Sequence, residues 1–235
     1  MMETSMDAQN HNSIIESMPV ESISQGYLFL ARCFSYPDEG FYKAIKDNML
    51  NEEIRCLVEE LPFLVNFTGM ASPSLHQDEF ESEYISSFDI GLGSSPPCPL
   101  YENFYRIGEL TRRDILEEIL LFYEHFDIAL SEDEKDYPDH LAAELEFMAF
   151  LSQKEADSIS CGKDPAPFRL AQSDFLERRL NKWAYRLDKR IQERIKEPFY
   201  KGASGFMVEF ISNHLLYLKA LKGNAAYIPS SDLND

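Results

Sequence analysis

The chain has few of the residues that mark β-sheets, zinc sites and disulfide frameworks. Glycine accounts for 10 of its 235 residues, and alternating valine-rich runs are rare. This composition favours helices over a sheet. The cysteines are widely spaced and form no C-x-x-C pair, which predicts free thiols in a reducing compartment and disfavours a zinc site. They are Cys33, Cys56, Cys98 and Cys161.

Targeting and membrane-spanning segments are also missing from the sequence. Residues 1–18 are polar and acidic, and they lack the basic start and apolar core of a secretory signal. No run reaches the roughly 18 apolar residues of a membrane span. We therefore expect a cytoplasmic protein with no stable membrane insertion.

Basic residues are in short supply. The 22 Lys and Arg residues face 41 Asp and Glu residues, which gives a formal net charge of −19. Nucleic-acid binding is disfavoured, because phosphates need Lys and Arg to displace their counterions, and so is binding to an anionic membrane surface. The charge suits a partner that carries positive charge, or it serves solubility alone.

The motifs of common catalytic and metal sites are absent. The sequence has no G-x-x-x-x-G-K-[ST] or G-x-G-x-x-G phosphate-binding turn, and no H-E-x-x-H or Glu-x-x-His metal motif. His140 and Glu144 would supply two metal ligands, but no third ligand is evident. We expect no enzyme activity, no bound cofactor and no metal.

Apolar residues recur at helical spacing along most of the chain. The pattern predicts an all-α, single-domain helical bundle of about eight or nine helices over residues 19–222. A disordered segment over residues 1–18 and a loose C-terminal tail over residues 223–235 are expected to flank this domain. Ser22 or Ser24 is expected to cap the first helix. The predicted helices cover residues 26–34, 39–48, 52–61, 77–88, 111–126, 139–156, 168–196 and 198–222.

Residues 137–148 are expected to change from a loop into a helix. Pro138 fits the first helical position, and Asp139 would then lie in the first turn, where the helix dipole favours negative charge. An adjacent face of this helix carries His140, Glu144 and Phe147, beside a buried apolar stripe. By spacing alone, a helix cap and a surface ion pair are the more ordinary interpretation of these polar residues.

Residues 89–101 connect two predicted helices without regular structure, because they contain three prolines and two glycines. Several of their side chains are nevertheless apolar, among them Ile90, Leu92, Leu100 and Tyr101. We expect this loop either to pack against the body and line a groove, or to be a plain crossover.

Three segments, residues 138–148, 84–101 and 174–200, together resemble one known family, the TorD/DmsD/NarJ-type maturation chaperones. The first is similar to the family's signature. The second resembles the branch that serves type II enzymes such as selenate, chlorate and perchlorate reductases, ethylbenzene dehydrogenase and dimethyl sulfide dehydrogenase. The third resembles the family's late helix pair. Residues 92–95 and Asn103 depart from the branch pattern, which leaves the client open.

The resemblance implies a cytoplasmic, all-helical protein that binds the catalytic subunit of a molybdenum enzyme of the dimethyl sulfoxide reductase family. Such chaperones hold this subunit, often by its N-terminal leader, until a molybdenum-bis(guanine dinucleotide) cofactor is inserted. With exported clients, they also delay twin-arginine export. A monomer is expected, with a helix-swapped dimer as the alternative.

A leader with paired arginines and an apolar segment needs carboxylates beside an aromatic-lined groove. The predicted carboxylates are Asp136, Asp139 and Glu144, grouped around Pro138. His140 would hold Asp139 in place or sense protonation near neutral pH. The predicted apolar wall consists of Tyr84, Phe88, Leu100, Tyr101 and Phe147.

Two other functions stay open at this point. One is an enzyme that uses His140 and Glu144 as acid and base on a small molecule, which turnover by the purified protein would reveal. The other is an accessory subunit that stays in the mature complex, which co-purification with the finished enzyme would reveal.

The substitutions Asp139→Ala and His140→Ala are each expected to weaken leader binding and client activation. For Asp139→Ala the physical reason is the loss of a desolvated arginine–carboxylate contact, which costs about 2–5 kcal/mol. His140→Ala would act through Asp139, which His140 is expected to hold in place. Calorimetric titration of each folded variant with a leader peptide measures the effect on binding. Unchanged binding and activation in both variants would exclude these two residues from the client site.

Overall fold

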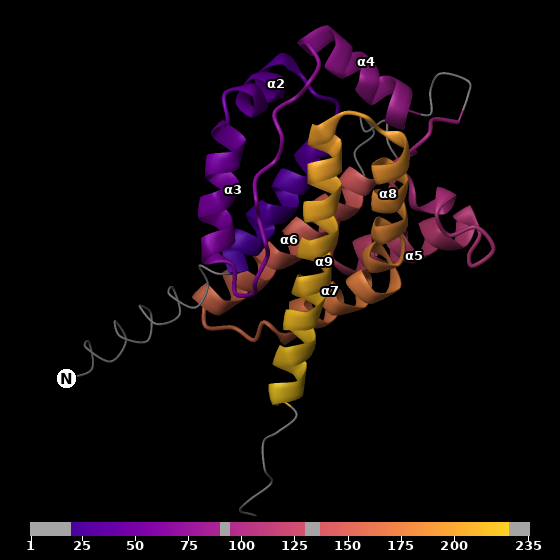
Figure 1. Cartoon of the computed structure of the whole chain (residues 1–235). Helices are drawn as coiled ribbons and strands as arrows, with labels where there is room; N and C mark the ends of the chain where they lie inside the picture. The colour runs from indigo at the N-terminus through magenta and orange to yellow at the C-terminus, as the bar shows by residue number, and fades with distance from the viewer. Residues whose placement is uncertain (1–19, 90–94, 130–136, 226–235) are drawn as a thin grey trace, which may run out of the picture.

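Figure 1 shows the computed structural model of the chain, in which residues 20–89, 95–129 and 137–225 are described. These residues form nine α-helices and one short 3-10 helix, with no β-strand among them. The predicted all-α fold is thereby confirmed. The elements are a first helix over residues 20–33, α2 (Glu39–Lys46), α3 (Met49–Glu60), α4 (Gln77–Phe88), η2 (Glu102–Phe104), α5 (Arg112–His125), α6 (Leu141–Ser160), α7 (Ala166–Arg178), α8 (Leu180–Arg194) and α9 (Pro198–Ala225).

The long C-terminal helix α9 runs through the centre of the packing. Helices α7 and α8 pack against it, and α7 also packs against α6, as the orange and yellow ribbons in Figure 1 show. Trp183 of α8 and Phe210 of α9 are fully buried. Tyr27 of the first helix meets Phe210 edge to face, with 5.0 Å between ring centroids. Each such side chain contributes about 1.5–3 kcal/mol through burial, so aromatic packing joins the two ends of the described chain.

Local sequence explains where several helices begin. The Asp38 side chain accepts a hydrogen bond from the backbone N–H of Phe41 and caps α2. Thr111 and Asp114 form a reciprocal capping box at the start of α5, which satisfies backbone N–H groups that the helix leaves unpaired. The predicted helix over residues 77–88 coincides with α4, and the prediction over 111–126 exceeds α5 by one capping residue at each end.

The expected cap of the first helix is wrong. Residues 20–33 are helical, so Ser22 and Ser24 lie inside the helix and not at its start. Their hydroxyl groups donate to the Glu60 carboxylate at 3.0 Å and to the Ala149 carbonyl at 2.9 Å. Serine is favoured at caps because its hydroxyl bonds nearby backbone groups; here both hydroxyls have distant partners instead.

The predicted helix over residues 168–196 is two helices. Helix α7 ends at Arg178 and α8 begins at Leu180, because Arg179 between them departs from helical geometry with φ −120° and ψ −99°. The Arg179 side chain is fully buried and forms ion pairs with Glu102 and Glu118. Contacts with residues this distant in sequence override local helix propensity, and no glycine or proline marks the break.

The ends of the predicted domain are only partly described. The predicted disordered segment and residues 226–235 of the predicted tail lie outside the described residues, so the domain limits stay a prediction. Helix α9 passes through Gly223, where it was expected to end, and continues to Ala225. All four cysteines are free thiols, as their spacing predicts. Within the described ranges, no helix has both the length and the apolar character that crossing a bilayer requires.

A glycine on the first helix allows α9 to come close. A β-carbon at Gly26 would lie 2.5 Å from Cζ of Phe210, whereas one at Gly205 on α9 would meet nothing within 4 Å. Gly26→Ala is therefore expected to lower the free energy of unfolding by about 1–3 kcal/mol through overpacking. The matched Gly205→Ala change should be neutral or raise it by up to about 1 kcal/mol through helix propensity. Urea denaturation of both variants measures this, and equal stabilities would contradict the close contact.

Candidate functional site

The polar residues of the 137–148 stretch lie at the N-terminus of α6, but not where a helix starting at Pro138 would place them. The backbone N–H of His140 donates to the Tyr137 carbonyl at 2.9 Å and closes a turn that contains Pro138 and Asp139. His140 is the N-cap, and its Nδ1 atom accepts from the backbone N–H of Ala142 at 3.2 Å. The expected placement of Pro138 and Asp139 inside the helix is thus wrong, because proline fits the second position of a turn equally well.

The proline-containing loop packs directly against this turn. The backbone N–H of Glu102 donates to the Asp139 carbonyl at 3.0 Å, and that of Leu141 donates to the Leu100 carbonyl at 2.8 Å. The rings of Tyr101 and His140 meet edge to face at 4.9 Å. The part of the loop that precedes η2 therefore packs against the body, as expected, whereas residues 90–94 lie outside the described residues.

Asp139 is buried beneath an arginine from the start of α5. The Asp139 side chain is inaccessible to solvent, and its Oδ1 atom lies 3.7 Å from Nη2 of Arg112. The Arg112 guanidinium also lies over the ring of Tyr137, at 4.3 Å from its centroid. Burial raises the pKa of Asp139, and Arg112 opposes only part of that effect. Arg112 itself reaches the surface, since 40% of its side chain is exposed.

A second buried carboxyl group, Glu144, shares a hydrogen bond with Glu102. Trp183 Nε1 donates to Glu144 Oε2 at 3.2 Å, while Glu102 pairs with Nη2 of Arg179 at 2.5 Å and with Nη1 of Arg106 at 2.9 Å. Burial and the nearby Glu102 charge raise the pKa of Glu144 well above its ordinary value. Because two guanidinium groups face Glu102 directly, we place the shared proton on Glu144.

This network contains the residues that sequence reasoning missed. Glu102, Arg106, Arg179 and Trp183 were not predicted as site residues, although all are buried. The adjacent Arg178 and Arg179 offered no signal, because arginines are ordinary on exposed helical faces. Only the fold brings Arg179 next to Glu102, which lies 77 positions earlier in the chain.

The predicted apolar wall is divided among separate clusters. Leu100 and Tyr101 lie against the start of α6, where they contact Leu141 and His140. Tyr84 and Phe88 pack together elsewhere, against Phe34 and Tyr200. Phe147 lies in a third cluster with Phe122, Tyr123 and Phe175. None of the five predicted wall residues is more than 9% exposed, and Asp136 lies outside the described residues.

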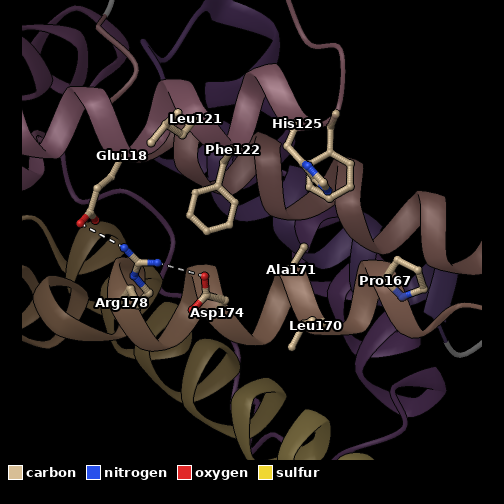
Figure 2. A pocket seen from close by; sticks show the side chains of 10 residues that line it. Glu118, Leu121, Phe122, His125, Pro167, Leu170, Ala171, Asp174 and Arg178 are labelled. Carbon is tan, nitrogen blue, oxygen red and sulfur yellow. Dashed lines mark hydrogen bonds and ion pairs between the residues drawn. The ribbon is translucent and has the colours of Figure 1, made fainter.

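An open hollow lies between α5 and α7, which we call the α5–α7 groove (Figure 2). Its volume is about 470 Å³. Leu121 on α5 and Leu170 on α7 are 65% and 59% exposed there. The predicted Phe147 lies behind it, with ring centroids 6.0 Å from Phe122 and 6.2 Å from Phe126. The groove is lined by Glu118, Leu121, Phe122, His125, Phe126, Pro167, Leu170, Ala171, Asp174 and Arg178.

The described residues thus form an all-helical domain with a surface groove between α5 and α7 and a buried charge network. Comparison with known proteins identifies the family: the model of the nitrate reductase delta subunit family matches residues 47–188. That match covers more than half of the chain, and the chain belongs to this family.

Three curated relatives specify the branch. The chain is 36% identical to the selenate reductase assembly chaperone protein of Thauera selenatis, over 77% of this chain and 81% of the relative. It is 35% identical to the chlorate reductase assembly chaperone protein of Ideonella dechloratans, over 86% and 92%. It is 26% identical to the perchlorate reductase assembly chaperone protein of Dechloromonas aromatica, over 89% and 96%. The predicted resemblance to maturation chaperones is confirmed, and these relatives support the prediction that the chain is not an enzyme.

The protonated state of Glu144 predicts a pH-dependent stability difference. The folded chain keeps a proton that the unfolded chain loses above about pH 4.5, so stability from this group falls as the pH rises. Glu144→Gln replaces the proton-dependent donor with an amide that can still donate to Glu102 and accept from Trp183. The free energy of unfolding of the variant minus that of the wild type should therefore increase as the pH rises above about 4.5, by at most ~1.4 kcal/mol per pH unit.

Urea denaturation at several pH values measures this difference. The matched control is Glu124→Gln, which removes an exposed carboxylate from α5. The control should show no comparable trend. A difference for Glu144→Gln that does not change with pH would mean that the Glu144 carboxyl group is ionised in the folded chain.

Proposed function

We propose that this chain is an assembly chaperone for the catalytic subunit of an oxidoreductase whose cofactor is molybdenum-bis(guanine dinucleotide). In this proposal it acts in the cytoplasm as a monomer, holds the unfinished subunit by its N-terminal leader until the cofactor is inserted, and delays twin-arginine export. The observation that carries the proposal is the similarity to assembly chaperones over most of both chains. The cofactor belongs to the client, and the chaperone supplies a binding surface.

The α5–α7 groove is the surface that suits an unfolded leader. Large apolar side chains that remain exposed at a hollow are typical of binding sites, and Leu121 and Leu170 face solvent from its two helices. Glu118 and Asp174 lie at one end (Figure 2). The apolar part of a leader would cover the leucines, while its arginine would face the carboxylates. The net charge of −19 attracts a basic segment from a distance.

In this proposal, the polar site residues predicted from the sequence form a second contact with the client. Asp139 is buried and already paired with Arg112, so a client arginine would have to replace Arg112 beside it. His140 follows Asp139 directly and Asp136 precedes it by three positions, and in this proposal both contact the same segment. Glu144 acts through its hydrogen bonds within the fold, and the five wall residues would require a change in packing to touch a client.

A pull-down with the tagged full-length chain from its native cytoplasm tests the function. We expect it to recover one catalytic subunit, identified by mass spectrometry, that still carries its leader and is poor in molybdenum. Recovery of the finished enzyme alone would instead indicate an accessory subunit. Recovery of no catalytic subunit, with that subunit expressed, would overturn the proposal.

Replacing the groove leucines is expected to weaken capture of the client. Leu121→Ser and Leu170→Ser each remove apolar surface that the leader would cover, and burial of one such side chain is worth about 1.5–3 kcal/mol. Each change should therefore weaken leader binding by about tenfold or more, as measured by calorimetric titration. The control is Leu216→Ser on α9, whose side chain is 62% exposed but lies outside the groove. Equal effects of the three changes would exclude the groove as the leader site.

A further inference from the structure

One end of the α5–α7 groove is occupied by an arginine of the chain itself. Nη2 of Arg178 lies 3.1 Å from Oε1 of Glu118, and its Nη1 lies 3.3 Å from Oδ2 of Asp174. Figure 2 shows the Arg178 guanidinium between these carboxylates. In the free chain, the position between these two carboxylates at the end of the groove is therefore already filled by Arg178.

Glu118 is held in a fixed orientation by a different residue. Its Oε2 atom lies 3.1 Å from Nη1 of Arg179, and Arg179 is fully buried and also paired with Glu102. The two oxygens of Glu118 thus have separate roles, since Oε2 is tied to the interior and Oε1 is presented to the groove. A carboxylate that is already oriented loses less conformational freedom when it binds a guanidinium.

Arg178 itself is weakly held. Its side chain is 49% exposed, and those of Glu118 and Asp174 are 30% and 43% exposed. Ion pairs between groups this exposed contribute little, because water and salt screen them. If another guanidinium group took the place of the Arg178 side chain beside Glu118, no buried contact would be lost. The buried partner of Glu118 is Arg179, and that ion pair would remain.

We propose that Arg178 occupies the position of a leader arginine in the free chaperone, and that the client arginine displaces it on binding. This inference rests on the proposed function and specifies its groove. The occupant is a leader segment that places one arginine between Glu118 and Asp174 and apolar side chains over Leu121, Phe122 and Leu170. Arg178 is then an internal competitor of the client arginine, and a segment without an arginine at that position binds less tightly because it does not replace the ion pairs of Arg178.

The test uses the leader peptide of the catalytic subunit that the wild-type chain recovers, and a second peptide in which the leader arginines are replaced by glutamine. Binding of both is measured by calorimetric titration. Arg178→Ala is expected to tighten binding of the arginine peptide about three- to tenfold, because the competitor is gone. Glu118→Gln and Asp174→Asn are each expected to weaken it about tenfold and to reduce the discrimination between the two peptides.

The matched control is Arg113→Ala, which removes the same charge from α5. Arg113 is 84% exposed, pairs with Glu117 and does not line the groove. General electrostatic attraction would make both arginine variants tighten binding equally, whereas displacement predicts a clear gain for Arg178→Ala alone. Equal gains, or a loss in Arg178→Ala, would overturn the inference.

The outcomes also separate the inference from the proposed function. If the wild type binds the leader but Arg178→Ala does not bind it more tightly than Arg113→Ala does, the inference is wrong and the chaperone function stands. If the wild type binds neither leader nor catalytic subunit, the proposed function fails, and the inference fails with it.

Discussion

The arrangement of the helices depends most on the ion pairs that the buried guanidinium of Arg179 forms with Glu102 and Glu118. This guanidinium lies between Glu102 of η2 and Glu118 of α5, at the junction of α7 and α8. A buried arginine is tolerated only with carboxylate partners, and removal of one partner from such a pair typically costs about 3–5 kcal/mol. The break between α7 and α8 follows from this constraint, because Arg179 leaves helical geometry and turns its side chain into the interior.

The same network explains what the polar residues of the 138–148 stretch, which resembles the family signature, do in the fold. Its histidine caps α6, and its glutamate at position 144 joins η2 to α8 through Glu102 and Trp183. Asp139 is buried under Arg112. In this conformation His140, Asp139 and Glu144 serve the fold first, since they cap α6, pair with Arg112 and accept a hydrogen bond from Trp183, respectively. A client contact at Asp139 would therefore be coupled to movement of Arg112.

The groove and the buried network meet at Glu118. Glu118 presents one oxygen to Arg178 at the surface and the other to Arg179 in the interior. The apolar floor of the groove is likewise continuous with the core, because Phe122 packs against Phe147 and Phe175. A ligand in the groove would thus lie against packed aromatic side chains, beside the exposed side chains of Leu121, Leu170 and Arg178. Side chains that are already packed lose less entropy on binding.

The sequence by itself determined the helical class, the positions of α4 and α5, the acidic charge and the resemblance that the family match confirms. These properties depend on spacing, capping residues and composition, all of which are local. Tertiary structure alone decided the break at Arg179, the turn at Pro138, the division of the predicted aromatic wall and the position of the open groove. Leu121 and Leu170 lie 49 positions apart, and whether two leucines face solvent across one groove or lie in the core depends on how their helices pack. That packing is set by long-range contacts, which hydrophobic periodicity cannot specify.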